Sequence, residues 1–283
     1  MGVPFFSFRS RGLKAMSTVN KCLPFPETVP SDLSECRDIA EGAVFIIASG
    51  ASAKDFPLCE FQHVPMIVVN GAISMFLNTP VSPYFYVCTD SGFFTQQTRL
   101  FHAALAKSQR VVLREDYAQH NIPLATGEFY ALKKAPKATW KDLFSGAPSN
   151  LIRRSKFYKG RNSTIGFSKD LREGYFDART VAYLALQVAF HAGFNKVFMV
   201  GVDLCPETGR FYETVESAKS PCVLDEHLES RIIPSFELMA EKVINPEFSV
   251  YNLSTISKLP SSIIPYISIE EVKTLVPAKA LDH

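Results

Sequence analysis

Residues 177–204, DARTVAYLALQVAFHAGFNKVFMVGVDL, contain the pattern that decides the fold. Asp177 is a residue type that caps the start of a helix, and Gly193 favours the left-handed conformation that ends one. The segment KVFMV that follows is short, apolar and rich in β-branched and aromatic residues, which is typical of a buried strand. The stretch therefore predicts a helix over residues 178–192 and a strand over residues 196–200.

The same alternation extends along most of the chain. Further strand-like runs cover residues 44–48, 66–69, 84–88, 110–113 and 248–253, and further helix-like runs cover residues 71–78, 96–107 and 233–243. Strands that alternate with helices form a parallel sheet with helices on both of its faces. We therefore expect an α/β protein with a Rossmann-like, doubly wound, mostly parallel sheet.

We expect one α/β domain over residues 41–283, preceded by an N-terminal extension over residues 1–40. Residues 121–169 have weak periodicity and many lysines, prolines and glycines, which predicts an inserted basic lid. Between Asn121 and Asn162 the basic residues outnumber the acidic ones nine to two.

Both basic segments favour an anionic partner. The insertion contains Arg153, Arg154 and Lys156, and the first 21 residues contain Arg9 and Arg11 among three phenylalanines. Basic residues beside aromatic ones favour contact with an anionic membrane surface. A solvated insertion and a loose chain start are the alternative interpretation. Nothing resembles a signature of nucleic-acid binding, so no nucleic-acid partner is expected.

Composition narrows the class of protein further. No apolar run approaches the roughly 20 residues that span a bilayer, and the first residues do not form a signal peptide. The six cysteines are scattered, with no pair at CxxC or zinc-ligand spacing. These features predict a cytoplasmic protein with reduced thiols, peripheral on a membrane if the basic segments contact lipid.

Polar residues follow or close most of the predicted strands. In a doubly wound sheet, ligands bind beyond the carboxyl ends of the strands. The residues expected on this rim are Ser49, Gly50, Ser52, Asn70, Thr89, Asp90, Asp203, Asn252 and Ser254. Gly50 allows a close approach of the backbone, and the two serines in its loop offer donors to a phosphate or a base. A plain strand–turn–helix connection is the alternative for this loop.

The sequence has no Asp-x-Asp and no HExxH motif, so we expect no required metal and no cofactor. Negative charge on a departing phosphate then needs hydroxyls, amides and arginine. The candidates are Arg179 and Thr180, expected in the first turn of the long helix, together with Arg210 and Tyr212.

Two histidines differ in their surroundings. His191 lies on the apolar helix, which predicts a packed core residue. His227 lies in LDEHLES beside Asp225 and Glu226, and neighbouring acids favour a histidine that works as a base near neutral pH. A solvated helix start is the alternative for His227.

Several collinear segments are similar to a known family. The lipopolysaccharide-core Kdo transferases of enterobacterial type (the KdoIII transferase family; Kdo is 3-deoxy-D-manno-oct-2-ulosonic acid) resemble this chain over roughly residues 44–272. The segments that carry the resemblance are VNGAISMF, YFYVCTDSGFF, GFSKDLREGYFDARTVAYLALQVAF, GVDLCPETGRFYE and VYNLSTISKLP. More distantly, the chain resembles the small bacterial sialyltransferases, which use a CMP-activated sugar acid and have a variant of the GT-A fold.

The resemblance implies an inverting transfer of Kdo from CMP-Kdo to the lipopolysaccharide inner core. It places nucleotide handling on Ser49, Gly50, Ser52, Asn70, Asp203 and Tyr212, and the general base on His227. This chain departs from the sialyltransferase pattern at Leu204 and Cys205, where a phosphate-binding tyrosine is expected, so Asp225 or Glu226 stays open as the base. Ser254 is a candidate partner for the donor carboxylate.

The sequence leaves three alternative functions open. The chain is compatible with a transferase for another CMP-activated nonulosonic acid, such as sialic or pseudaminic acid. A pterin pyrophosphokinase-like enzyme of related fold would need magnesium and an acidic metal site. A non-catalytic nucleotide-binding module would bind CMP without turnover.

Overall fold

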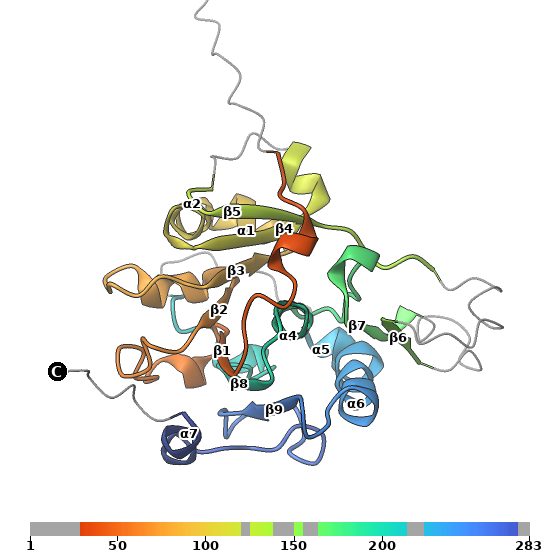
Figure 1. Ribbon diagram of the computed structural model, residues 1–283. Helices are drawn as coiled ribbons and strands as arrows, with labels where there is room; N and C mark the ends of the chain where they lie inside the picture. The colour runs from red at the N-terminus through yellow and green to blue at the C-terminus, as the bar shows by residue number, and fades with distance from the viewer. Residues whose placement is uncertain (1–28, 120–124, 138–149, 155–163, 214–223, 277–283) are drawn as a thin grey trace, which may run out of the picture.

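A seven-stranded sheet forms the centre of the molecule (Figure 1). The computed structural model describes residues 29–119, 125–137, 150–154, 164–213 and 224–276. The strands lie in the order β5-β4-β3-β2-β1-β8-β9, and every neighbouring pair is parallel. Their bounds are β1 Ala43–Ile47, β2 Met66–Val69, β3 Phe85–Cys88, β4 Arg110–Arg114, β5 Glu128–Leu132, β8 Lys196–Val200 and β9 Ser249–Asn252. The order confirms the doubly wound α/β prediction.

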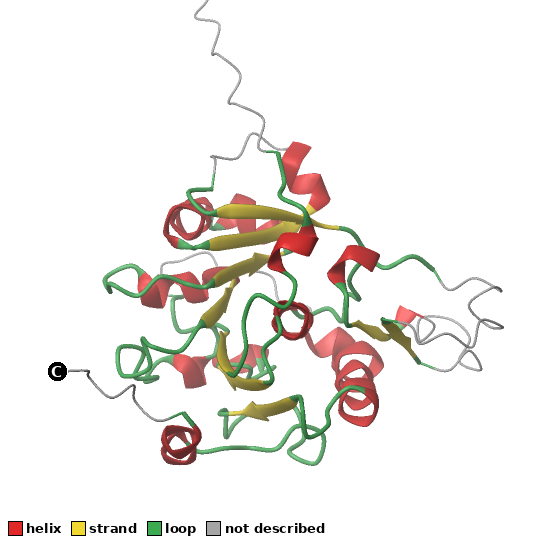
Figure 2. Ribbon diagram, viewed as in Figure 1, coloured by secondary structure: helices red, strands yellow, loops and turns green. Residues whose placement is uncertain are grey.

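Helices cover both faces of this sheet (Figure 2). Along β1, Val44 and Ile46 enter a core with α4 and α6, whereas Phe45 and Ile47 enter a second core with η3, α2 and α7. Each fully buried side chain of this size stabilises the fold by about 1.5–3 kcal/mol through burial of its apolar surface.

The helices of the described residues are η1 Leu33–Cys36, η2 Ala51–Ala53, η3 Asn70–Phe76, α1 Ser91–Gln96, α2 Thr98–Lys107, η4 Glu115–Gln119, η6 Leu171–Glu173, α4 Val181–Ala192, η7 Pro206–Thr208, α5 Leu224–His227, η8 Leu228–Ile232, α6 Ile233–Lys242 and α7 Ile269–Leu275.

The start of α4 differs from the sequence prediction. Thr180 is the N-cap residue, and Asp177 instead accepts a hydrogen bond from the Arg179 N–H at 2.9 Å. Arg179 has a φ of +65°, so the chain turns sharply before it becomes helical. The prediction that Asp177 caps the helix and that Arg179 and Thr180 lie in its first turn was therefore wrong. Gly193, with a φ of +99°, ends α4 as predicted.

The sheet also contains residues that were expected outside it. Strand β5 lies in the range predicted as a lid, and it pairs with β4 from Arg110↔Glu128 to Arg114↔Leu132. The Ser31 N–H donates to the Phe129 carbonyl at 2.7 Å, and the Ala40 N–H donates to the Ala192 carbonyl at 2.9 Å. Residues 31–40 and 128–132 are therefore parts of the sheet domain. A short hairpin, β6 Leu151–Arg153 and β7 Gly166–Ser168, follows.

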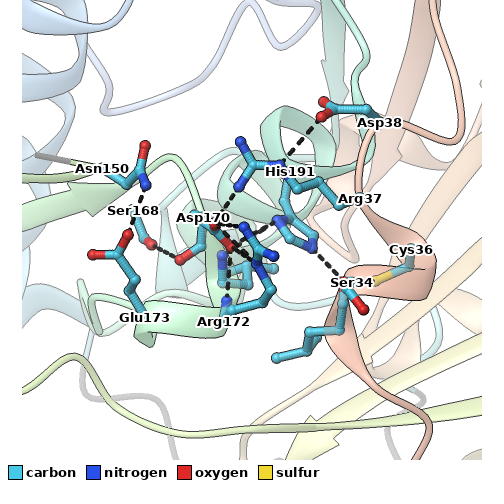
Figure 3. A network of polar contacts seen from close by, with 12 residues as sticks. Ser34, Cys36, Arg37, Asp38, Asn150, Ser168, Asp170, Arg172, Glu173 and His191 are labelled. Carbon is cyan, nitrogen blue, oxygen red and sulfur yellow. Dashed lines mark hydrogen bonds and ion pairs between the residues drawn. The ribbon is translucent and has the colours of Figure 1, made fainter. Parts of the chain in front are cut away.

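A polar network around the buried side chains of Asp170 and His191 connects residues 33–37 to η6 and to the end of α4 (Figure 3). Asp170 accepts hydrogen bonds from Arg37 and Arg172, and these cations outweigh the effect of burial and lower its pKa. The Leu171 N–H donates to Nδ1 of His191, whose Nε2 lies 2.8 Å from the Leu33 carbonyl. Burial lowers the pKa of His191. His191 is thus a neutral, hydrogen-bonded core residue, as predicted.

Candidate functional site

A cavity of about 580 Å³ lies at the carboxyl ends of the strands. The winding of the sheet reverses between β1 and β8, which is where ligands bind in doubly wound folds. The predicted site residues that line it are Ser49, Gly50, Asn70, Thr89, Asp90, Arg179, Thr180, Asp203 and Arg210. Ser52, Tyr212, Asn252 and Ser254 are not among its lining residues. The structure therefore brings most of the predicted rim together.

Asp203 braces the loop after β1. Its buried carboxylate accepts hydrogen bonds from the Ser52 N–H at 3.0 Å, from the Ser52 hydroxyl, and from the Ser254 hydroxyl at 2.6 Å. Asn252 accepts in turn from the Ser254 N–H at 3.2 Å. The hydroxyls of Ser52 and Ser254 are thus directed at Asp203, so these residues set the shape of the site from behind the cavity.

Two glycines allow close approaches around this loop. A Cβ at Gly50 would lie 2.5 Å from the Gly201 carbonyl and from the Asp203 carboxylate. The Phe211 N–H donates to the Ser49 carbonyl at 3.1 Å, so the chain at residues 210–212 crosses the loop. A Cβ at Gly71 would lie 2.1 Å from the Tyr212 ring. Tyr212 therefore packs on the start of η3, next to Asn70.

Backbone strain is concentrated at the cavity. Among the described residues other than glycine, Asp38, Asn70, Arg179 and Leu204 have a positive φ, and the last three line the cavity. Such conformations cost of order 1–3 kcal/mol and persist where the surrounding structure enforces them, often at functional sites. The amide oxygen of Asn70 is also buried without a hydrogen-bond partner in the described structure. A bound ligand with a hydrogen-bond donor would satisfy it.

The other end of the cavity contains residues that the sequence analysis missed. Arg114, at the end of β4, and Lys134, just after β5, line the cavity together with Tyr175 and Asp177. Arg114 directly follows the strand predicted over residues 110–113, so the strand-end rule applies to it, but the sequence analysis did not include it. Lys134 was assigned to the lid because β5 was not recognised.

Each of these two cations is paired with a carboxylate. Nε of Arg114 lies 2.6 Å from Oδ1 of Asp116, and hydrogen bonding to Asp116 raises the pKa of the guanidinium. Nζ of Lys134 lies 3.0 Å from Oδ2 of Asp177. Burial acts to raise the pKa of Asp177, but the Arg179 N–H and the Lys134 ammonium outweigh it and lower the pKa. Asp177 is therefore ionised at neutral pH.

His227 is half-buried at the end of α5 and is not among the lining residues, although Leu224 in the same helix is. The helix continues into the π-helical turn η8, a feature found frequently at functional sites. Arg231 of η8 donates to the Asp177 carbonyl at 2.7 and 3.0 Å. The helix that carries His227 is thus attached to the wall of the cavity.

The basic residues expected to contact acceptor or membrane are in different surroundings. Arg153 donates to the Pro136 carbonyl at 2.7 Å and lies over the Phe176 ring, and Arg154 lies 3.8 Å from Glu237. Neither is among the residues that line the cavity. Lys156, Arg9 and Arg11 lie outside the described residues.

The described residues contain no group of three or more His, Cys, Asp or Glu side chains placed to hold a metal ion. Nor does this part of the chain include a helix long and apolar enough to cross a membrane. The strand-end hydroxyls and the N-terminus of α4 at this cavity are suited to an anionic nucleotide ligand.

A family model described as 3-deoxy-D-manno-octulosonic acid transferase WaaZ matches residues 31–130 and 137–270. A probable 3-deoxy-manno-octulosonic acid transferase of Salmonella typhimurium is 29% identical over 241 residues, covering 81% of this chain and 87% of the relative. A protein of Escherichia coli with the same description is 27% identical over 242 residues, covering 81% of this chain and 83% of the relative.

Two solved structures show weaker similarity. A Maf glycosyltransferase from Magnetospirillum magneticum has a TM-score of 0.43 at 15% identity. The match covers 82% of this chain and 35% of the Maf chain. The sialyltransferase CstII from Campylobacter jejuni, in complex with cytidine-5'-monophosphate, has a TM-score of 0.40 at 13% identity. That match covers 79% of this chain and 84% of CstII.

Proposed function

The chain belongs to the 3-deoxy-D-manno-octulosonic acid transferase family of the WaaZ type, glycosyltransferases that act on the lipopolysaccharide core, and from this premise we propose its reaction. The protein transfers Kdo from CMP-Kdo to the lipopolysaccharide inner core with inversion at the anomeric carbon. The observation that carries this proposal is the cavity at the reversal of the sheet, lined by polar residues at the strand ends and by the start of α4.

The nucleotide end of the cavity is formed by the loop after β1 and by the start of α4. Ser49, Gly50 and Asn70 line it on the sheet side, and Val181 and Ala182 line it at the helix start. Thr180 makes no side-chain cap to α4, and the Tyr183 N–H donates to the Thr180 carbonyl, so the amides proposed to meet a ligand are those of Val181 and Ala182. Amides and dipole at a helix N-terminus favour a phosphate, and the neighbouring Arg179 adds a positive charge. We assign the CMP phosphate to this place.

The reaction is a single displacement. An acceptor hydroxyl oxygen attacks C2 of Kdo and loses its proton to His227, while the bond between C2 and the phosphate oxygen breaks. The electron pair stays with the phosphate, and CMP departs. Arg179 and the α4 amides stabilise the phosphate charge that develops, with Arg210 as a further candidate. Asp225 and Glu226 are the alternative bases, because both lie within two residues of His227.

We predict that the protein consumes a CMP sugar as donor without needing a metal ion. Release of CMP should be seen with CMP-Kdo, should persist in EDTA, and should be much slower with CMP-sialic acid. Binding of CMP should be tighter than binding of UMP or AMP, because the site is proposed to hold a cytidine nucleotide.

A panel of CMP-Kdo, CMP-sialic acid, CMP-pseudaminic acid and ATP, assayed with and without EDTA, measures this directly. Strict dependence of CMP release on magnesium or manganese would overturn metal-independent transfer, and release of AMP from ATP would replace the proposal with a pyrophosphokinase. A preference for another CMP sugar would change the donor, and binding of CMP without turnover would leave a nucleotide-binding module.

We further propose that the protein acts on the anionic inner-membrane surface. Arg153 and Arg154 have packing contacts, so reversing their charge would also disturb the fold. A second variant replaces Arg9, Arg11 and Lys14 with glutamine; these three residues lie outside the described residues. Each basic residue near an anionic surface contributes about 1 kcal/mol, and salt screens the effect.

We therefore expect sedimentation with anionic vesicles at low salt, release at high salt, and weaker binding of the triple variant. Neutral phosphatidylcholine vesicles are the control. Equal binding of wild type and variant would exclude these three residues, and no sedimentation at low salt would exclude the membrane contact.

A further inference from the structure

The cavity extends along the sheet beyond the part that we assign to the nucleotide. Its lining runs from Asp203, after β8, to Lys134, after β5. Neighbouring strands lie about 4.8 Å apart, so the ends of β1 and β5 are separated by about 19 Å across four strand spacings. If the donor phosphate binds between the loop after β1 and the start of α4, the end of the cavity beside β4 and β5 is left for another substrate group.

Two positively charged side chains face that end from adjacent strands. Two nitrogens of Arg114 contact the Asp116 carboxylate and a third lies 3.4 Å from the Thr89 carbonyl, which fixes the plane of the guanidinium. Lys134 makes one described hydrogen bond, to Asp177 at 3.0 Å. A guanidinium has five N–H groups and an ammonium has three, so both keep donors for a ligand. The one carboxylate at the end of β3, Asp90, accepts from the Gly92 N–H at 2.9 Å and caps α1.

The backbone beneath Lys134 is held in a defined position. The Tyr175 N–H donates to the Lys133 carbonyl at 2.9 Å, and the Ala135 N–H donates to the Tyr175 carbonyl at 2.8 Å. Gly174, with a φ of +104°, permits this contact, because a Cβ there would lie 2.7 Å from the Ala135 Cα. The Asp170 network fixes η6, which ends directly before Gly174 (Figure 3). The wall that carries Lys134 is therefore tied to the core.

We propose that the β4–β5 end of the cavity is an acceptor subsite, in which Arg114 and Lys134 bind an anionic group of the acceptor, a carboxylate or a phosphate. This inference rests on the proposed transferase function. The carboxylates of Asp116 and Asp177 orient the cations, and the two oxygens of one anion accept from both. Charge-assisted hydrogen bonds of this kind are about twice as strong as neutral ones.

The test compares Lys134→Gln with Lys133→Gln. Both side chains are exposed and both substitutions remove one positive charge, but Lys133 does not line the cavity. Lys134→Gln should raise the KM for the natural acceptor about tenfold, equivalent to about 1.4 kcal/mol. The KM for the donor and the slow hydrolysis of donor in the absence of acceptor should be unchanged. Lys133→Gln should behave as wild type, and Lys134→Arg should restore most of the acceptor affinity.

Acceptor analogues identify the anion. One analogue has its carboxylate converted to an amide, and a second lacks its phosphate. If the group removed from an analogue is the one that Lys134 binds, wild type and Lys134→Gln should have the same KM for that analogue. Equal effects of the two lysine substitutions, or a raised donor KM in Lys134→Gln, would overturn the subsite. Failure of wild type to release CMP from CMP-Kdo would instead overturn the proposed function.

Discussion

Replacing His227 with alanine should lower turnover by about 10²–10⁴-fold and leave the affinity for CMP nearly unchanged. The reason is that a general base acts on the acceptor hydroxyl and makes no contact with the nucleotide. Turnover and CMP binding are measured separately, by CMP release at saturating substrates and by titration calorimetry.

Variants at another histidine and at the two neighbouring acids are the controls for this prediction. His102→Ala, at an exposed histidine of α2, should have normal turnover. Glu226→Gln tests an exposed acid of α5. Asp225 is paired with Lys258 at 2.9 Å, so Asp225→Asn is compared with Lys258→Gln, which breaks the same ion pair. Near-normal turnover of His227→Ala, together with a large loss in one acid variant, would assign the base to that acid.

Replacing Asp203 with asparagine should lower stability by about 2–4 kcal/mol and raise the KM for the donor. Asp203 accepts three hydrogen bonds at a buried position, and hydrogen bonds to a charged group contribute about 1.5–3 kcal/mol each. The asparagine amino group would face donors, so at least one of them loses its partner. The loop that carries Ser49 and Gly50 would then move.

Urea denaturation measures the change in the free energy of unfolding, and donor titration measures the KM. Asp55→Asn is the matched control, because Asp55 is exposed shortly after the same loop and should tolerate the change. An unchanged donor KM in a folded Asp203→Asn protein would mean that the hydrogen bonds to Asp203 do not shape the donor site. A stability equal to that of the control would mean that the carboxylate is replaceable.

Most of the sheet follows from local sequence pattern. The predicted strand over residues 66–69 coincides with β2, and the one over residues 196–200 coincides with β8. Apart from Lys196 at the start of β8, these runs are apolar because the sheet is covered on both faces, so their burial is visible in the sequence itself. Because strand ends in a parallel sheet share one edge, the convergence of Asn70, Thr89 and Asp203 could be predicted as well.

Strand β5 was hidden because it is an edge strand with an exposed first residue, in a stretch rich in lysine and proline. Its pairing partner, β4, decides its structure, and pairing is not a local property. The same tertiary contact places Lys134 at the cavity. Likewise, the turn at Arg179 depends on how the segment before α4 packs, so the pattern alone placed the start of the helix too early.

The sequence by itself determined the fold class, the edge of the sheet that carries the site and the family, because these depend on periodicity, strand ends and collinear motifs. The tertiary structure alone decided which polar side chains are hydrogen-bonded to each other and which are left without a partner among the described residues. Ser52 and Ser254 are hydrogen-bonded to Asp203, whereas the Asn70 amide oxygen is unpartnered in the described structure. The physical reason is that hydrogen-bond partners come from strands distant in sequence, which only the packed sheet brings within 3 Å.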